Sequence, residues 1–206
     1  MSSMTEQQAA ALGKRAARGR ATRDQLIEVA TRLFAEHGYE ATSIEAVLAA
    51  AGVSRGALYH HFAGKEALFD AVFQALSMRI TEELGATAAG ATDPVDALNK
   101  VAVAWISMAG DAETQRILLV DAPSVLGWER WRTADEGRTL GAMRAMLQAI
   151  SDSGRLEPAL VAPFSHIILA ALDELALVVA RAEDPQAALA EGRSATEELL
   201  RRLLGS

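Results

Sequence analysis

The sequence of 206 residues has no cysteine, which excludes disulfides, thiolate metal ligands and cysteine nucleophiles. It also lacks a long uncharged run, because the longest stretch without Asp, Glu, Lys or Arg covers only the fifteen residues 158–172. A membrane-spanning helix needs about 20 apolar residues. The amino terminus has no continuous apolar segment of the kind that forms a secretory signal. We therefore expect a cytoplasmic protein with no membrane-spanning helix.

Charge is distributed unevenly along a chain of ordinary globular composition, in which half of the residues are hydrophobic. The net charge is −7, yet residues 1–65 carry eight basic and six acidic residues, whereas residues 66–206 carry 12 and 21. Five of the basic residues fall within residues 14–23: Lys14, Arg15, Arg18, Arg20 and Arg23. We predict that residues 1–21 form a flexible basic extension, which is either an arm that contacts a partner or a solvated tail.

The spacing of apolar residues predicts helices almost throughout. Apolar residues three and four apart indicate a helix that begins at Thr22 and that Gly38 ends. Thr22 with Gln25, and Thr42 with Glu45, have the spacing of a capping box. The sequence therefore predicts one helix from Thr22 and a second, shorter helix from Thr42.

Further helices are predicted over residues 54–62, 65–84, 111–121 and 128–153, the last of them ended by Gly154. Three more begin near prolines, because a proline at the first helical position removes no hydrogen bond: Pro94, Pro163 and Pro185. No alternating strand pattern and no internal repeat is found. The sequence therefore predicts an all-α fold of about nine helices.

Two short helices joined by a glycine-containing turn, with a third helix beside them, are typical of a helix-turn-helix. The second member of such a pair enters the major groove of DNA, and here it covers residues 54–62. It combines a small residue for close backbone approach with polar residues that suit phosphates and base edges: Gly56, Arg55, Tyr59, His60 and His61. The alternative is an ordinary helical hairpin with a polar outer face.

A longer motif covers the same region. It consists of Thr42-Ser43, the run AAGVSRGALYHHF over residues 50–62, and Lys65-Glu66-Ala67-Leu68. This motif resembles the amino-terminal signature of the TetR family of bacterial transcriptional regulators, over roughly residues 22–70. The resemblance implies a helix-turn-helix DNA-binding domain over 22–66 and a helical effector-binding and dimerisation domain over 67–206, with a connecting helix over about 65–84.

The resemblance also implies individual roles in DNA binding. Ser43 and Tyr59 would hold phosphates, and His61 and Lys65 would reach the DNA backbone. The residues implied at the major groove are Ser54, Arg55, Gly56 and His60. These roles are physically sensible where a residue starts a helix, because free N–H groups and the helix dipole attract phosphate there. For His60 and His61, a solvated helix face is the alternative.

The last two expected helices carry more apolar surface than one core requires. The helix over 163–180 is apolar nearly all round, so it needs a second packing partner. The final helix has a seam of residues spaced by three and four: Leu189, Gly192, Thr196, Leu199 and Leu203. Together they predict half of a four-helix interface, and the resemblance likewise implies a homodimer through the last two helices.

All three tryptophans and four of the six methionines lie beyond the helix-turn-helix. Such side chains line apolar ligand cavities, and they also fill ordinary helical cores. Asp121 is either a ligand-facing carboxylate or an acid at a helix end. The predicted ligand contacts are Trp105, Met108, Ile117, Asp121, Trp128, Met143, Met146 and His166.

Other classes of protein are weighed against this hypothesis. The sequence contains no HExxH, no GxSxG and no glycine-rich phosphate loop. A small helical enzyme or metal-binding protein would have to use His166, Asp173 and Asp121, and a helical protein-interaction module is a third alternative.

We favour a ligand-responsive transcriptional regulator without catalytic residues, metal or cofactor. It would bind palindromic operator DNA as a dimer and leave it when a small apolar or amphipathic effector binds. Repression needs only occlusion of a promoter, and activation stays open.

Overall fold

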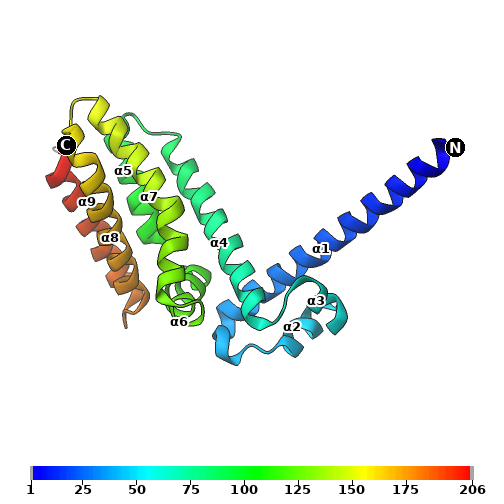
Figure 1. Cartoon of the computed structure of the whole chain (residues 1–206). Helices are drawn as coiled ribbons and strands as arrows, with labels where there is room; N and C mark the ends of the chain where they lie inside the picture. Colours follow the sequence, from blue (N-terminus) through cyan, green and yellow to red (C-terminus); the bar gives the residue numbers. More distant parts are fainter. Residues whose placement is uncertain (1, 205–206) are drawn as a thin grey trace. The chain divides into compact units, whose positions relative to one another are not determined.

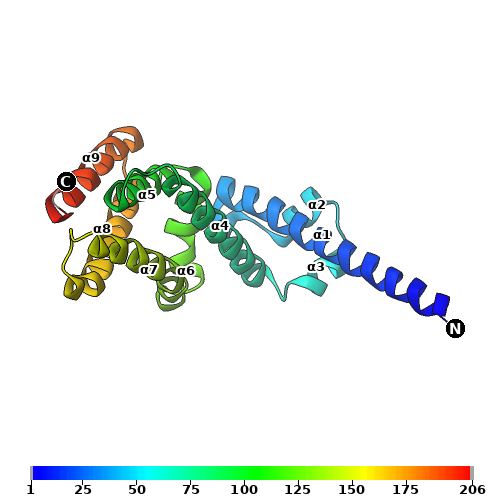
Figure 2. The same cartoon turned by 90° about the horizontal axis from the view of Figure 1, so that it is seen from above.

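The structure is a computed structural model that describes residues 2–204, with side chains described there except at 2–12, 14, 15, 128 and 132–138. Over this range the chain forms nine α-helices, one π-helix, one short 3-10 helix and no strand (Figures 1 and 2), which confirms the predicted all-α fold. Contacts divide the chain into two compact units, Met1–Ala75 and Leu76–Ser206. The division falls inside one helix, later than the boundary at residue 66 that the motif suggests.

Helix α1 (Ser2–Ala41) begins well before Thr22, so the predicted start at that residue is wrong. The Thr22 hydroxyl donates to the Arg18 carbonyl inside the helix, at 3.1 Å. Gln25 does not close a capping box either, because its Nε2 donates to the Ala51 carbonyl at 2.9 Å. Both side chains have the right spacing for a cap, but the helix continues through them.

The helical backbone of α1 is interrupted at Gly38, whose φ of 79° lies in the region that favours glycine. Thr42 is buried, and its hydroxyl donates to the Gly38 carbonyl at 2.8 Å. Thr42 therefore secures this kink, and the predicted capping role passes to its neighbour. Ser43 is the N-cap of α2 (Ile44–Ala51), since its Oγ accepts the N–H of Ala46 at 3.1 Å.

Helix α3 (Arg55–His61) is held at both ends by local hydrogen bonds. Gly52 ends α2 in the left-handed conformation, with φ of 65°. The Ser54 Oγ then accepts the N–H of Ala57 at 3.2 Å, and the N–H of Phe62 donates to the Leu58 carbonyl at 2.9 Å. The short helix therefore has defined ends despite its length.

An aromatic cluster holds the first unit together. The first turns of α4 (Lys65–Ala88) contribute Phe69, which is fully buried. Its ring packs edge-on against Phe34 and against Tyr39, with 5.1 Å between ring centroids in each pair. Phe34 and Tyr39 also stack on each other at 5.9 Å. Such offset and edge-to-face pairs add to the stability gained by burial, so α4 is part of this core.

The second unit contains the remainder of α4 and seven further elements. They are α5 (Pro94–Met108), η1 (Thr114–Asp121), α6 (Ala122–Val125), α7 (Trp128–Asp152), η2 (Pro158–Leu160), α8 (Val161–Ala180) and α9 (Pro185–Leu204). Pro94 and Pro185 begin their helices as predicted, whereas Pro163 lies within the first turn of α8. The predicted segment 111–121 is mostly η1, a π-helix. In Figure 1, α5, α7, α8 and α9 lie side by side.

Helix α9 packs closely against its neighbours at Gly192. A β-carbon added there would lie 3.1 Å from the Ile106 Cγ2 of α5 and 3.2 Å from the Val179 Cγ2 of α8. Thr196 and Leu200 are fully buried on the same face of α9. Two members of the predicted seam, Gly192 and Thr196, therefore pack within their own chain, while Leu189, Leu199 and Leu203 are half-buried.

The segment Pro158–Ala180, which includes α8, is long and apolar enough to span a membrane by length and composition. The sequence itself predicts no such span, because its longest uncharged run covers fifteen residues. This helix also packs against α7, α9 and α5, and we interpret it as the central helix of the second unit. Its outward side exposes 56% of Ile167 and 53% of Val178.

Candidate nucleic-acid interface and ligand cavity

The outward face of α3 carries a continuous set of polar groups. Arg55 and His60 are exposed, and Tyr59 is 48% exposed although it is a large aromatic residue. Gly56 is exposed, and a β-carbon added there would meet only the Ser54 Oγ, at 4.0 Å. Because Leu58 and Phe62 are buried beneath it, this face is presented on a fixed helix.

Arg55 forms an ion pair with Glu45 of α2, between two exposed side chains. A pair in this setting contributes little to stability, because solvent screens it and two long side chains are ordered. The Arg55 guanidinium therefore lies on the outer surface of the helix-turn-helix, and it can exchange Glu45 for another anionic partner. Ser43 is also exposed, at the amino-terminal end of α2.

Lys65 is positioned at the start of α4 by two contacts. Its Nζ donates to the Glu40 carbonyl at 3.2 Å and lies 4.2 Å from the centre of the Tyr39 ring. Burial, together with the nearby carboxylates of Glu66 and Glu40, raises the pKa of Tyr39. The phenol therefore stays neutral at physiological pH, and its ring face remains available to the ammonium group.

The structure places the eight predicted DNA contacts on neighbouring parts of the first unit. Six are exposed, while His61 and Lys65 are half-buried. The imidazole ring of His61 lies 5.0 Å from that of His60 between ring centroids. A cation, hydroxyls and imidazoles on one short helix match the donors that proteins use toward DNA.

The second unit contains a partly open apolar cavity of about 420 Å³ between α4, α5, α7 and α8, with one residue of η1. Three of the predicted ligand contacts line it, namely Trp105, Met143 and Met146. Sequence reasoning missed the contribution of α4, which includes Ile80 and Leu84. These residues continue the apolar stripe of the connecting helix. The spacing of that stripe was the sequence signal that could have placed them at the cavity.

The other predicted ligand contacts do not line this cavity. Met108 borders a smaller hollow beside α4, and Ile117 is fully buried in the core. Asp121 is buried at the end of η1, where its carboxylate accepts from the Arg116 Nε at 3.3 Å. His166 is exposed on α8. The side chain of Trp128 lies outside the described residues.

Two polar groups are notable at the cavity. The Trp105 indole N–H is buried and has no hydrogen-bond partner within the described part of the chain. Asp173 of α8 contributes a carboxylate to the wall. Among the described residues, no three His, Asp or Glu side chains gather in a way that could hold a metal ion.

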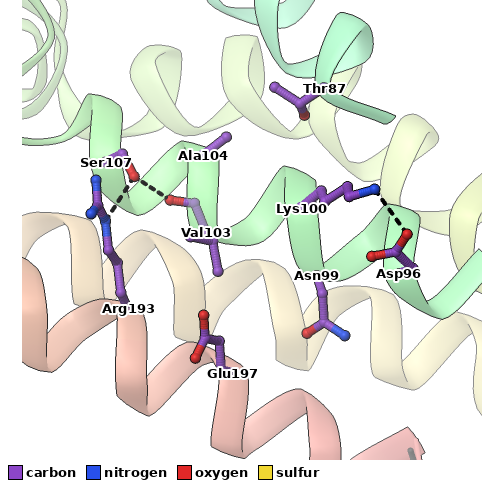
Figure 3. A pocket seen from close by; sticks show the side chains of 9 residues that line it. All are labelled: Thr87, Asp96, Asn99, Lys100, Val103, Ala104, Ser107, Arg193 and Glu197. Atoms are coloured by element: carbon purple, nitrogen blue, oxygen red, sulfur yellow. Dashed lines mark hydrogen bonds and ion pairs between the residues drawn. The ribbon is translucent and has the colours of Figure 1, made fainter. Parts of the chain in front are cut away.

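An open polar groove lies elsewhere on the second unit, between the end of α4, α5 and α9 (Figure 3). Three of its four charged side chains are engaged locally. Arg193 donates from Nε to the Ser107 Oγ at 3.0 Å, and the Lys100 Nζ donates to the Asp96 Oδ2 at 2.9 Å. The groove is therefore a polar surface that differs in kind from the apolar cavity.

A fixed recognition helix in one unit and a hollow helical bundle in the other define a DNA-binding transcriptional regulator of the helix-turn-helix class. Two family models match the chain. One, described as bacterial regulatory proteins of the tetR family, matches residues 26–72. The other, described as the tetracyclin repressor-like C-terminal domain, matches residues 95–203. The chain belongs to the TetR family.

Individual relatives agree with this assignment. A crystal structure of a TetR-family transcriptional regulator from Pectobacterium atrosepticum is 34% identical, with a TM-score of 0.83, over 92% of this chain and 97% of that chain. The transcriptional repressor AcnR of Corynebacterium efficiens is 44% identical over 30% of this chain and 32% of its own length. The regulator AcrR of Shigella flexneri is 34% identical over 48% and 46%. The chain thus spans less than half the length of these two curated relatives.

The fold is also shared with more distant proteins. FadR from Bacillus subtilis, solved in complex with stearoyl-CoA, has a TM-score of 0.70 and 20% identity. The match covers 85% of this chain and 96% of that chain. At this identity the likeness concerns the fold.

Proposed function

We propose that this protein is a cytoplasmic repressor that binds a palindromic operator as a homodimer and releases it when a small apolar or amphipathic effector enters the cavity of the second unit. The observation that carries the proposal is the combination of an exposed polar face on a helix with fixed ends and a partly open apolar cavity of about 420 Å³. Neither feature is needed for the stability of a helical chain.

For DNA binding, we assign contacts with phosphates to Ser43, Tyr59, His61 and Lys65. We assign contacts in the major groove to Ser54, Arg55, Gly56 and His60. Tyr59→Ala would lower affinity for operator and scrambled duplexes alike, because a phosphate contact carries no sequence information. Arg55→Ala would also reduce discrimination between the two duplexes. Titrations of both variants by fluorescence anisotropy test this, with an operator selected from random DNA by the wild-type protein. Equal losses on both duplexes for Arg55→Ala would remove that residue from base recognition.

Release of the operator by the effector would depend on α4, which has buried residues in both units. Leu68 and Phe69 belong to the core of the first unit, while Ile80 and Leu84 line the cavity of the second. A ligand that repacks one end of this helix can therefore bias its other end. A 100-fold loss of operator affinity requires a coupling free energy of about 2.7 kcal/mol, and the coupling must be reciprocal.

Tryptophan fluorescence offers a direct screen for the effector, because all three tryptophans lie in the second unit. Trp105 lies on the cavity wall, so ligands that enter should change its emission. Ala142→Leu adds bulk at an exposed residue of the cavity lining and should weaken such ligands while preserving operator binding. The release hypothesis would fail if ligands that quench this fluorescence left operator affinity unchanged.

We assign the dimer interface to the outer sides of α8 and α9. The exposed apolar residues Ile167 and Val178 on α8, and the half-buried Leu199 on α9, support this assignment. Ala176 is fully buried within one chain, so a charge there would test folding and not association. Val178→Glu should give a folded monomer in sedimentation velocity, because a carboxylate would be buried without a partner. A folded dimer would place the interface elsewhere.

A further inference from the structure

One segment of α1 carries cations without acids. Residues 7–23 include five basic and no acidic residues. Within the described part of the chain, Arg18, Arg20 and Arg23 are exposed, and none of them forms an ion pair. Several arginines of the second unit differ, as Arg155 pairs with Asp93 and Arg201 with Glu198. The charge of this segment of α1 is therefore available to an outside anion.

The same segment lies against the end of the recognition helix. A β-carbon placed on Gly19 would lie 3.9 Å from the His61 Cε1. The guanidinium of Arg23 lies 5.5 Å from the centre of the Phe62 ring. All of these residues belong to the first unit, so the basic part of α1 borders the surface that α3 offers to DNA.

We infer that residues 16–23 of α1 form a second contact with the same duplex, in which Arg18 and Arg20 lie against backbone phosphates beside the half-site held by α3. The inference rests on the proposed function. Double-stranded DNA carries one negative charge per about 1.7 Å of its axis, so a duplex bound at α3 brings phosphates toward the neighbouring cations. Continuity with α3 favours the operator itself over another polyanion.

The helical form of this segment has a consequence of its own. Gly13 and Gly19 lie inside the helix, where each glycine disfavours helix relative to alanine. The space for a methyl group is present, because nothing lies within 4 Å of a β-carbon at Gly13. At Gly19 the nearest atom would be at an ordinary contact distance. Alanine at both positions should therefore favour the helical arm without changing its charge.

The charge test uses the full chain with single variants Arg18→Ala and Arg20→Ala, and Arg144→Ala in α7 as the matched control. The probes are a duplex selected from random DNA by the wild-type protein and a scrambled duplex of equal length. Each arm variant should lose roughly fivefold to tenfold in affinity for both duplexes at 0.1 M salt. The slope of log affinity against log salt should become shallower by about one for each variant.

The helix test uses the double variant Gly13→Ala/Gly19→Ala on the same probes. We expect operator affinity to rise by about twofold to tenfold, because less ordering is needed on binding. Unchanged or weaker binding by this variant would overturn the helical presentation of the arginines. If Arg18→Ala and Arg20→Ala behave like Arg144→Ala, the second contact itself is overturned. If the wild-type chain enriches no duplex at all, the proposed function fails first.

Discussion

The first unit buries its large side chains against one another, whereas the second leaves about 420 Å³ unfilled between four of its helices. Phe34 and Phe69 are fully buried and meet edge to face in the first. In the second, Met143 and Met146 border open space. A filled core fixes the geometry of the surface above it, whereas unfilled space leaves room inside. The two units therefore use the same helical packing in opposite ways, as the roles proposed for them require.

Truncating one large side chain in each unit should show the difference in packing between the two units most clearly. Phe69→Ala removes a fully buried ring from the filled core and should lower the free energy of unfolding by about 3–5 kcal/mol. Met146→Ala removes a half-buried side chain beside existing space and should cost about 1 kcal/mol. Urea denaturation followed by circular dichroism measures both values. Similar losses for the two variants would mean that the cavity wall is packed as tightly as the aromatic core.

The unfilled space of the second unit is local, and a substitution at a glycine in a tightly packed region of the same unit tests this. Gly192→Ala would force a methyl group toward Ile106 and Val179, which lie 3.1 and 3.2 Å from the added carbon. We expect a loss of roughly 1–2 kcal/mol in the free energy of unfolding from overpacking. Gly141→Ala is the matched control, because it is exposed on α7 with nothing within 4 Å, and it should stabilise the helix. A stabilised Gly192→Ala variant would show that α9 is free to move outward.

The smallest expected effect concerns acid stability at the end of α9. Hydrogen bonds from Arg201 and Arg202 lower the pKa of Glu198 from 4.5 to about 2. Because the folded pKa is the lower one, the contribution of Glu198 is fully present above about pH 4.5 and is lost as pH falls toward 2. Glu198→Gln should flatten the pH dependence of stability in this window only slightly, since the group is exposed. Thermal melts of the wild type and the variant from pH 2 to 6 give this comparison. An unchanged pH dependence would mean that the Glu198 carboxylate does not contribute to the acid stability of the fold.

Local signals predicted the first unit better than they predicted the cavity. The helices over 44–51 and 55–61 follow from their caps and turn glycines, which act within a few residues. The early start of α1 was missed, because Thr22 and Gln25 have cap spacing but are used inside the helix. A cavity depends on which helices meet in space. Trp105, Met143 and Met146 were therefore found by residue type, while His166 has the right type and faces outward.

The continuity of α4 across the two units has a consequence for the order in which the molecule unfolds. Its first turns, up to Ala75, retain buried partners for Leu68, Phe69 and Val72 in the first unit even when residues 76–88 lose theirs. An isolated helix of this length would be marginal in water. Tertiary packing supplies the missing stability, so sub-global opening of the second unit can stop at Ala75 and leave the helix-turn-helix folded. The apolar cavity and α3 then lie in different cooperative segments of the chain, which can open separately.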